Sequence, residues 1–170
     1  MANLQDRRSD LGAARAARDE VIGEIESALH SLVRSLKQVR LNEYLLAKAR
    51  VDVDRAGVAL LYVLYVEGTS LRLTHLAELL QIEAPAVTRK AQQLEQSGLV
   101  SRTRDPKDGR VTQLQLTAQG RRTINRVLAA RREWLTTLLS NWTEATQIEF
   151  ARLVCVFTDN VNQHLKEIDA

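Results

Sequence analysis

Residues 73–116 read LTHLAELLQIEAPAVTRKAQQLEQSGLVSRTRDPKDGRVTQLQL. This segment predicts a short helix, a tight turn, a second helix and a two-stranded hairpin, in that order. We expect the first helix to begin at a Thr74 cap and to turn three leucines inward: Leu76, Leu79 and Leu80. Helix, turn, helix and hairpin in this order predict a winged helix-turn-helix.

The second helix of the pair has two different faces. Val87, Ala91 and Leu94 recur at steps of four and three, so they form a stripe that packs inward. The opposite side is polar, and it has the donors and acceptors needed to read base edges in the major groove. An ordinary solvated helix face is the alternative, but such a face usually has more Glu/Lys pairs. The candidate base-reading residues are Pro85, Ala86, Thr88, Arg89, Gln92 and Gln93.

The hairpin is expected to expose a polar tip. Its two β-compatible stretches are residues 99–105 and 111–117. In the second stretch, Gln113 and Gln115 alternate with apolar or threonine residues, which is the pattern of a half-buried strand. Between the stretches, Asp108-Gly109 supplies turn chemistry.

A long helix is predicted before this unit, capped by Ser9 or Asp10. About 30 residues at 1.5 Å each span ~45 Å, more than a small domain needs. We expect a second copy of the chain to cover its apolar seam, and a helical pair within one chain is the alternative. Residues before Val21 either extend the helix or are frayed. The seam residues, at alternating steps of three and four, are Ile22, Ile25, Leu29, Leu32, Leu36 and Val39.

The remaining helices complete a mainly α fold with a small β-hairpin wing. A helix capped by Asp54 and ended by Gly68 precedes the pair, and two long helices follow Thr117, the last capped by Thr143. We expect a winged helix-turn-helix lobe plus a helical dimerisation lobe. The predicted parts are an N-terminal dimerisation helix in 1–50, the winged lobe in 51–118 and C-terminal dimerisation helices in 119–170.

Composition is typical of a globular protein of the cytoplasm. Hydrophobic residues make up 45% of the chain and charged residues 26%. The longest apolar run, residues 58–66, is too short to cross a bilayer, and no signal core is found near the start. The single cysteine, Cys155, excludes an intrachain disulfide and suits a reducing compartment. We expect a buried, inert thiol, with redox sensing as the alternative.

Charge is segregated along the chain although the net charge is only +3. Residues 69–122 contain nine cations and five anions, whereas two cations face five anions from residue 140 onward. This distribution favours a protein that places one lobe against a polyanion. The sequence has no Gly-rich phosphate loop, no His-Glu metal motif and no nucleophile elbow. We therefore expect a binding protein rather than an enzyme, without a cofactor, whose partner is double-stranded DNA.

Five short motifs resemble the MarR-type (multiple antibiotic resistance regulator) transcription factors. They are Leu76-Ala77-Glu78-Leu79-Leu80, Pro85-Ala86-Val87-Thr88-Arg89, Leu94-Glu95-Gln96-Ser97-Gly98-Leu99-Val100, Asp108-Gly109-Arg110 and Leu116-Thr117-Ala118-Gln119-Gly120. The resemblance covers residues 22–165. It implies a homodimeric repressor whose first and last two helices intertwine, with each winged lobe reading half of a near-palindromic operator. The last helix would then add Leu153, Phe157 and Val161 to the dimer interface.

The resemblance also assigns roles to the wing. It implies that Arg110 enters the minor groove and that Asp108 holds its guanidinium. The candidate phosphate contacts, which position a lobe without specifying sequence, are Arg102, Arg104 and Lys107. One departure concerns Ala84, which stands where many relatives have a polar helix cap.

Relatives of this type often release DNA when a small aromatic molecule binds. By analogy, Tyr44, Tyr62 and Tyr65 could line such a pocket, and a place in the core is the alternative. A metal trigger is a further alternative, although the three histidines have no ligand spacing around them: His30, His75 and His164. A winged helix that binds protein instead of DNA also remains open.

Overall fold

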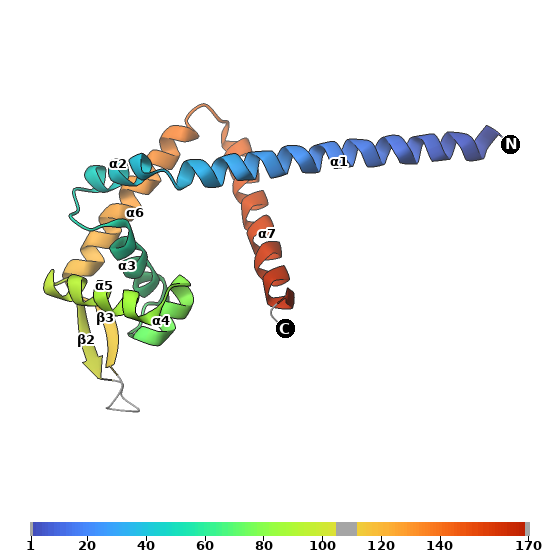
Figure 1. Cartoon of the computed structure of the whole chain (residues 1–170). Helices are drawn as coiled ribbons and strands as arrows, with labels where there is room; N and C mark the ends of the chain where they lie inside the picture. The colour runs from blue at the N-terminus through green and yellow to red at the C-terminus, as the bar shows by residue number, and fades with distance from the viewer. Residues whose placement is uncertain (1, 105–111, 169–170) are drawn as a thin grey trace. The chain divides into compact units, whose positions relative to one another are not determined.

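The computed structural model describes residues 2–104 and 112–168, with side chains from residue 15 onward. The chain divides into two compact units, Met1–Arg55 and Ala56–Ala170, and each is considered separately (Figure 1). Within the described residues, no helix is both long and apolar enough to span a membrane.

The first unit contains two helices, α1 (Ala2–Leu36) and α2 (Val39–Ala49). The predicted start at Ser9 or Asp10 is wrong, because α1 already begins at Ala2 and its first residues are mostly good helix formers. The prediction of one helix through Val39 is also wrong. Gln38 has an extended backbone, with ψ of 133°, so the helix stops there and Val39 opens α2.

The second unit begins with α3 (Arg55–Glu67), a strongly apolar helix. Leu60, Leu61 and Leu64 are at most 1% exposed and form the centre of the core. Gly68 ends the helix as predicted, with a φ of 68° that favours glycine. Its N–H donates to the Leu64 carbonyl oxygen at 3.3 Å.

The helical pair consists of α4 (Leu73–Leu80) and α5 (Ala84–Gln96). The predicted cap at Thr74 is wrong, since Arg72 occupies the N-cap position. Leu76 is fully buried as predicted, but Leu79 is 43% exposed. Leu79 lies about 60° from Leu76 around the helix, so periodicity alone predicted its burial, but the structure buries Ala77 instead and leaves Leu80 half-buried.

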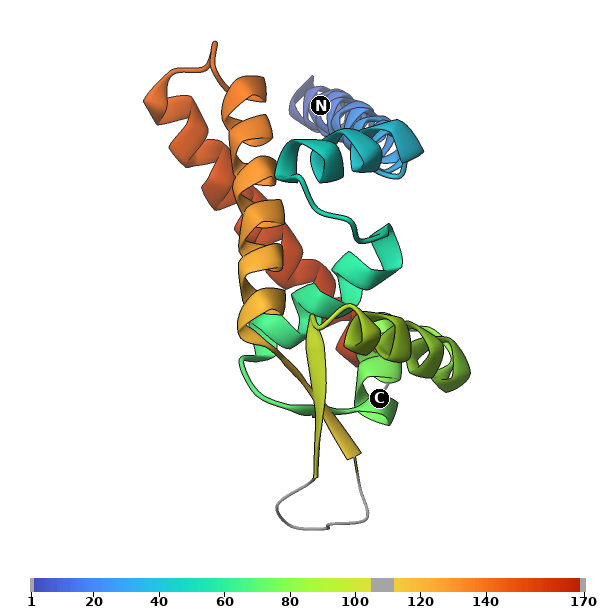
Figure 2. The ribbon, with the colours of Figure 1, turned by 90° about the vertical axis from the view of Figure 1, so that its left-hand side faces the viewer.

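Three short strands form one antiparallel sheet in the order β1-β3-β2, with β1 at Leu71–Arg72, β2 at Val100–Arg104 and β3 at Thr112–Leu116. The hairpin of β2 and β3 is confirmed, and Figures 1 and 2 show the two strands side by side. β1 was not predicted from the sequence, because two residues are too few to show an alternation. Leu71 pairs with Leu114, and both are buried.

Two long helices complete the second unit, α6 (Ala118–Leu138) and α7 (Glu144–Ile168). Thr143 caps α7 as predicted, accepting from the Thr146 N–H at 3.2 Å. α6 buries Ile124 and Val127 against the core, whereas α7 has no buried residue at all. Near the start of α7, the Trp142 and Phe150 rings meet edge to face at 5.2 Å.

Candidate nucleic-acid interface

The turn between α4 and α5 fixes how the second helix begins. Gln81 adopts the left-handed conformation, with φ of 53°. Its N–H donates to Glu78 O at 3.1 Å, and the Ile82 N–H donates to Ala77 O at 3.1 Å. These two bonds form a Schellman motif, which satisfies the last carbonyls of α4 and turns the chain sharply.

The N-cap of α5 is Glu83, one residue earlier than the sequence analysis placed it. Glu83 has an extended backbone and makes no side-chain cap hydrogen bond. Its carbonyl oxygen instead accepts from the Ala86 and Val87 N–H groups at 3.0 and 3.2 Å. The expected lack of a polar side-chain cap therefore holds, although Ala84 is already the first helical residue.

The two faces of α5 are divided as predicted. Val87 and Ala91 are fully buried, and Leu94 is 4% exposed. On the other side, the predicted base-reading residues are exposed, except for the half-buried Ala86: Pro85, Thr88, Arg89, Gln92 and Gln93. The structure thus brings these residues to one open helix face.

Three polar side chains of α5, those of Thr88, Lys90 and Gln93, are already engaged within the helix. The Thr88 hydroxyl donates to the Ala84 carbonyl oxygen at 2.9 Å. The Lys90 ammonium donates to Gln93 Oε1 at 2.7 Å. A pocket of about 410 Å³ lies beside these residues, and its wall includes Leu60, Leu80, Ile82, Arg89 and Lys90.

The base of the wing is tied to the start of α6 through Thr117. Its hydroxyl donates to the Gly98 carbonyl oxygen at 2.7 Å and accepts from the Gly120 N–H at 3.0 Å. A Cβ on Gly120 would lie 1.9 Å from the backbone oxygen of Leu99, so only glycine fits there. This geometry explains why the motif at residues 116–120 needs both Thr117 and Gly120.

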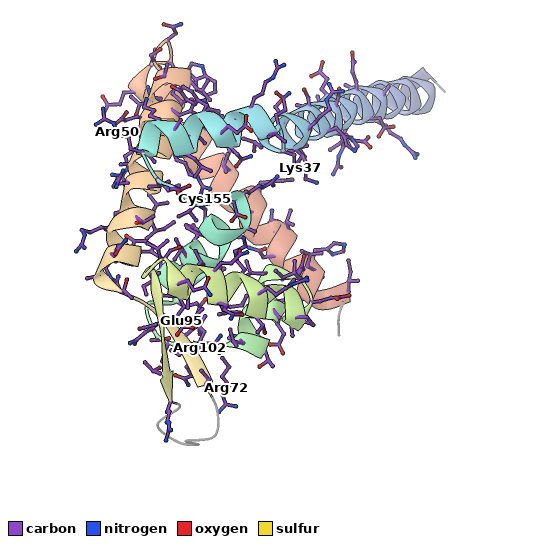
Figure 3. All side chains as sticks on the ribbon, turned by 60° about the vertical axis from the view of Figure 1, so that its left-hand side comes forward. Lys37, Arg50, Arg72, Glu95, Arg102 and Cys155 are labelled. Atoms are coloured by element: carbon purple, nitrogen blue, oxygen red, sulfur yellow. The ribbon has the colours of Figure 1, made fainter. Side chains whose placement is uncertain are left out.

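An ion pair connects α5, the predicted recognition helix of the helix-turn-helix, with the wing. Arg102 Nε on β2 donates to Glu95 Oε2 on α5 at 2.9 Å, and both side chains are about one-third exposed (Figure 3). Arg104 is exposed two residues further along the same strand. The predicted tip residues Lys107, Asp108 and Arg110 lie outside the described residues.

Arg72 is a basic residue of the wing sheet that the sequence analysis missed. It lies on β1 opposite Gln113 of β3 and is exposed (Figure 3). Next to it, the Ser70 hydroxyl donates to the Gln113 side-chain oxygen. The only sequence signal for Arg72 is that it is a cation directly before α4. Its place in the sheet could not be predicted, because the pairing of β1 depends on residues more than 40 positions away.

The residues of the predicted dimer interface are exposed in the single chain. On α1, Ile22 is 55% exposed, Leu32 52% and Leu29 37%. On α7, Leu153 is 50% exposed and Phe157 48%. The remaining members are also exposed: Ile25, Leu36 and Val161.

The expectation of a buried Cys155 is wrong for the single chain, since its thiol is exposed on α7 (Figure 3). The whole of α7 shares this exposure, since none of its residues is buried. Among the described residues, no three His, Cys, Asp or Glu side chains lie close enough together to hold a metal ion.

The three tyrosines occupy different surroundings. Tyr44 is 52% exposed on α2, with the Lys48 ammonium 5.9 Å from its ring centre. Tyr62 is 42% exposed on α3, and the Arg121 guanidinium lies 6.0 Å from the Tyr65 ring. Neither the pocket beside α5 nor the pocket at the junction of α1 and α2 is lined by any of the three tyrosines.

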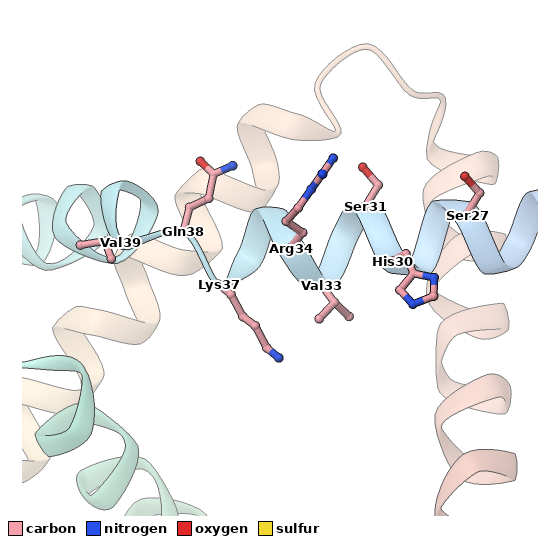
Figure 4. A pocket seen from close by; sticks show the side chains of 8 residues that line it. All are labelled: Ser27, His30, Ser31, Val33, Arg34, Lys37, Gln38 and Val39. Atoms are coloured by element: carbon pink, nitrogen blue, oxygen red, sulfur yellow. The ribbon is translucent and has the colours of Figure 1, made fainter.

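A second, open pocket of about 870 Å³ lies at the junction of α1 and α2 (Figure 4). Figure 4 shows Ser31 and Arg34 on one side of α1, with Val33 and Lys37 pointing to the other. The pocket is therefore a surface that runs around the junction rather than an enclosed site. Its lining consists of Ser27, His30, Ser31, Val33, Arg34, Lys37, Gln38 and Val39.

Comparison with known proteins identifies a family, a curated relative and two solved structures that the chain resembles. The model of the MarR family matches residues 55–112, which run from α3 to the start of β3. The chain is 31% identical over 135 residues to the HTH-type transcriptional repressor MdtR of Bacillus subtilis (strain 168), covering 79% of this chain and 84% of MdtR.

Among solved structures, a MarR family protein from Bacillus stearothermophilus matches with a TM-score of 0.75 and 21% identity, covering 85% of this chain and 97% of that one. A mutant of S. aureus MepR bound to an oligodeoxyribonucleotide matches with a TM-score of 0.57 and 20% identity, covering 80% and 97% of the two chains. At these identities, the two structures support the fold alone.

Proposed function

Because this chain belongs to the MarR family of transcriptional regulators, we propose that it is a homodimeric repressor that binds a near-palindromic operator in duplex DNA. Within this proposal, residues 51–118 form the DNA-binding lobe, and 1–50 and 119–170 supply the dimerisation helices. MdtR is named a transcriptional repressor, and the MepR structure contains bound DNA. Both properties are consistent with the same function here.

The observation that carries the proposal is the division of α5 into a buried and an open face. Val87, Ala91 and Leu94 hold the helix on its lobe, so the opposite stripe is free to enter the major groove. Arg89 on that stripe is exposed and has the planar donor pair that suits guanine O6 and N7. The polar residues around it are the remaining candidates for base contacts.

The wing supplies the contacts that position each lobe. Arg104 on β2 is exposed and can neutralise a phosphate, as can Lys107 at the tip. Arg110 is proposed to enter the adjacent minor groove, where a narrow groove attracts a guanidinium. Asp108 would orient that guanidinium. These contacts fix register on the duplex without specifying its sequence.

Dimerisation is proposed from the apolar faces of α1 and α7. Soluble monomers seldom expose contiguous apolar patches larger than a few hundred Å². Val21, Ile22, Ile25, Leu32 and Leu36 each expose more than 40% of their surface along α1. A two-fold interface between identical copies covers both copies of such a face at once. It also sets two recognition helices about one turn of duplex apart, roughly 34–36 Å.

A small aromatic ligand is proposed as the signal that releases DNA. The rings of Tyr44 and Tyr62 are exposed, and Tyr65 faces the Arg121 guanidinium, which could also pair with an anionic aromatic compound. Such a ligand lowers operator affinity only if it binds the two states of the dimer differently. A ligand that binds tightly but leaves operator affinity unchanged would contradict the proposed release of DNA by a small aromatic ligand.

The test of the proposed function is selection of duplexes from a random library by the purified full chain, followed by binding measurements across salt. We expect an enriched sequence with two-fold symmetry, bound at least about 10³-fold more tightly than random DNA. Arg89→Ala should weaken binding by about 1–3 kcal/mol and relax preference at one position of each half-site. As a matched control, Arg152→Ala removes an arginine that is paired with Glu149 on α7, and should leave the selected sequence unchanged.

Two outcomes contradict the proposal. Selection that enriches no sequence would show that this winged helix does not read DNA, and a protein-binding role would then replace it. An Arg89→Ala variant that selects the same sequence with unchanged affinity would show that another face of the lobe contacts the bases.

A further inference from the structure

The ion pair between Glu95 and Arg102 joins the two parts of the lobe that must contact DNA together. Glu95 lies in the last turn of α5, and Arg102 lies in the middle of β2. Their side chains meet at 2.9 Å between Nε and Oε2. The two residues are seven positions apart in the chain, so the contact spans the whole connection from helix to wing.

The sheet register explains why Arg102 points toward the helix. Arg102 is directly opposite Leu114, which in turn is opposite Leu71. Residues directly opposite in antiparallel strands have side chains on the same face of the sheet. Leu71 and Leu114 are buried, so this is the face that covers the core, and Arg102 extends its edge toward α5.

Electrostatics gives Arg102 a second reason to pair with Glu95. Glu95 is the one acidic residue in the sequence of α5. An anion in the last turn of a helix is unfavourable because the C-terminal end carries partial negative charge. A carboxylate next to phosphates is unfavourable as well. The Arg102 guanidinium offsets both costs at this position.

We propose that Arg102 is a positioning residue, held by Glu95, that fixes the angle between the recognition helix and the wing. This inference rests on the proposed DNA-binding function and replaces the phosphate contact expected from the sequence. Helix and wing enter different grooves of one duplex, so their relative angle decides whether both fit at the same time. The pair therefore acts on sequence selectivity rather than on general attraction to DNA.

The fold does not depend on this pair. Both side chains are about one-third exposed, and exposed ion pairs usually add less than about 1 kcal/mol to the free energy of unfolding. Removing either partner should therefore leave a folded protein. Effects on DNA binding can then be separated from effects on stability by measuring thermal unfolding of each variant.

The experiment measures dissociation constants of the full chain for its selected duplex and for a random-sequence duplex, across a range of salt. The variants are Glu95→Ala, Arg102→Ala and the double variant. Arg104→Ala is the matched comparison, because Arg104 is exposed two residues along the same strand. A lost phosphate contact reduces the salt slope by about one for every duplex.

We define the selectivity ratio as the dissociation constant for the random-sequence duplex divided by that for the selected duplex. We expect this ratio to fall about tenfold in each single variant and no further in the double variant. The salt slope of Arg102→Ala should match that of the parent, whereas the slope of Arg104→Ala should fall. The result for Glu95→Ala is the sharpest, since loss of an anion should otherwise improve DNA binding.

Three results would overturn the inference: a lower salt slope for Arg102→Ala, an unchanged selectivity ratio for Glu95→Ala, or additive losses in the double variant. Failure of the proposed function is different, because the parent would then select no duplex at all. A parent that selects a duplex while Arg102→Ala behaves like Arg104→Ala refutes this inference alone.

Discussion

Gly120 offers a severe test of how the wing is attached, because the space for its missing side chain is occupied by backbone. A Cβ there would lie 1.9 Å from the Leu99 oxygen and 2.9 Å from the Leu99 carbonyl carbon. Carbon atoms in contact normally lie about 3.5–4.0 Å apart. In Gly120→Ala, the first turn of α6 must therefore move away from the strand that begins the wing.

The cost of this movement follows from the contacts that it breaks. Thr117 joins the same segments by two hydrogen bonds, from its hydroxyl to the Gly98 carbonyl oxygen and from its N–H to the Leu99 carbonyl oxygen, and each contributes about 1 kcal/mol. Overpacking costs a further 1–3 kcal/mol, roughly, and the better helix propensity of alanine returns up to about 1 kcal/mol. We expect Gly120→Ala to lower the free energy of unfolding by roughly 2–4 kcal/mol.

The assay is urea unfolding followed by circular dichroism, with Gly23→Ala as the matched control. Gly23 is also helical, but a Cβ there would meet nothing within 4 Å. Gly23→Ala should therefore raise the free energy of unfolding by up to about 1 kcal/mol. A Gly120→Ala variant as stable as Gly23→Ala would refute the account of the wing base.

Two further predictions concern the dimer and the turn. Replacing Leu29 and Leu36 together by Glu should yield monomers or insoluble chain, because the change puts charge into the proposed seam. Ser27 and Ser31 lie on the other side of α1, so replacing them by Glu should leave the dimer intact. Sedimentation experiments measure the oligomeric state of both variants. A double Leu variant that remains a DNA-competent dimer would reject the seam. Gln81→Gly should raise the free energy of unfolding by about 0.5–1 kcal/mol, since glycine adopts the left-handed φ of 53° without strain, and operator affinity should not change. A less stable variant would show that the Gln81 side chain makes a contact that matters.

The elements that could be predicted from the sequence are those whose signal is local. Val87, Ala91 and Leu94 reveal the buried side of α5 because helical periodicity alone determines which residues share a face. Gly68 and Thr143 could be predicted as helix ends because their effects are local: Gly68 adopts a positive φ, and the Thr143 hydroxyl accepts from an N–H in the first turn of α7. The open polar face of α5 follows from the same periodicity.

The features that could not be predicted from the sequence depend on residues far away along the chain or on surfaces that this chain does not cover. β1 exists only because Leu71 pairs with Leu114, and the break before α2 depends on the extended backbone of Gln38. Cys155 was expected to be buried from its apolar neighbours, but Val154 and Val156 are exposed as well, and covering them is left to the proposed dimer. Arg102 looked like a free cation until the fold brought Glu95 to it.

The proposed repressor function requires two copies of the lobe that read successive turns of one duplex. Hydroxyl-radical footprinting of the purified protein on its selected duplex measures this spacing. We predict two protected patches related by two-fold symmetry, with centres about 10 base pairs apart and two chains bound per duplex. A single protected patch, or one chain per duplex, would contradict the account.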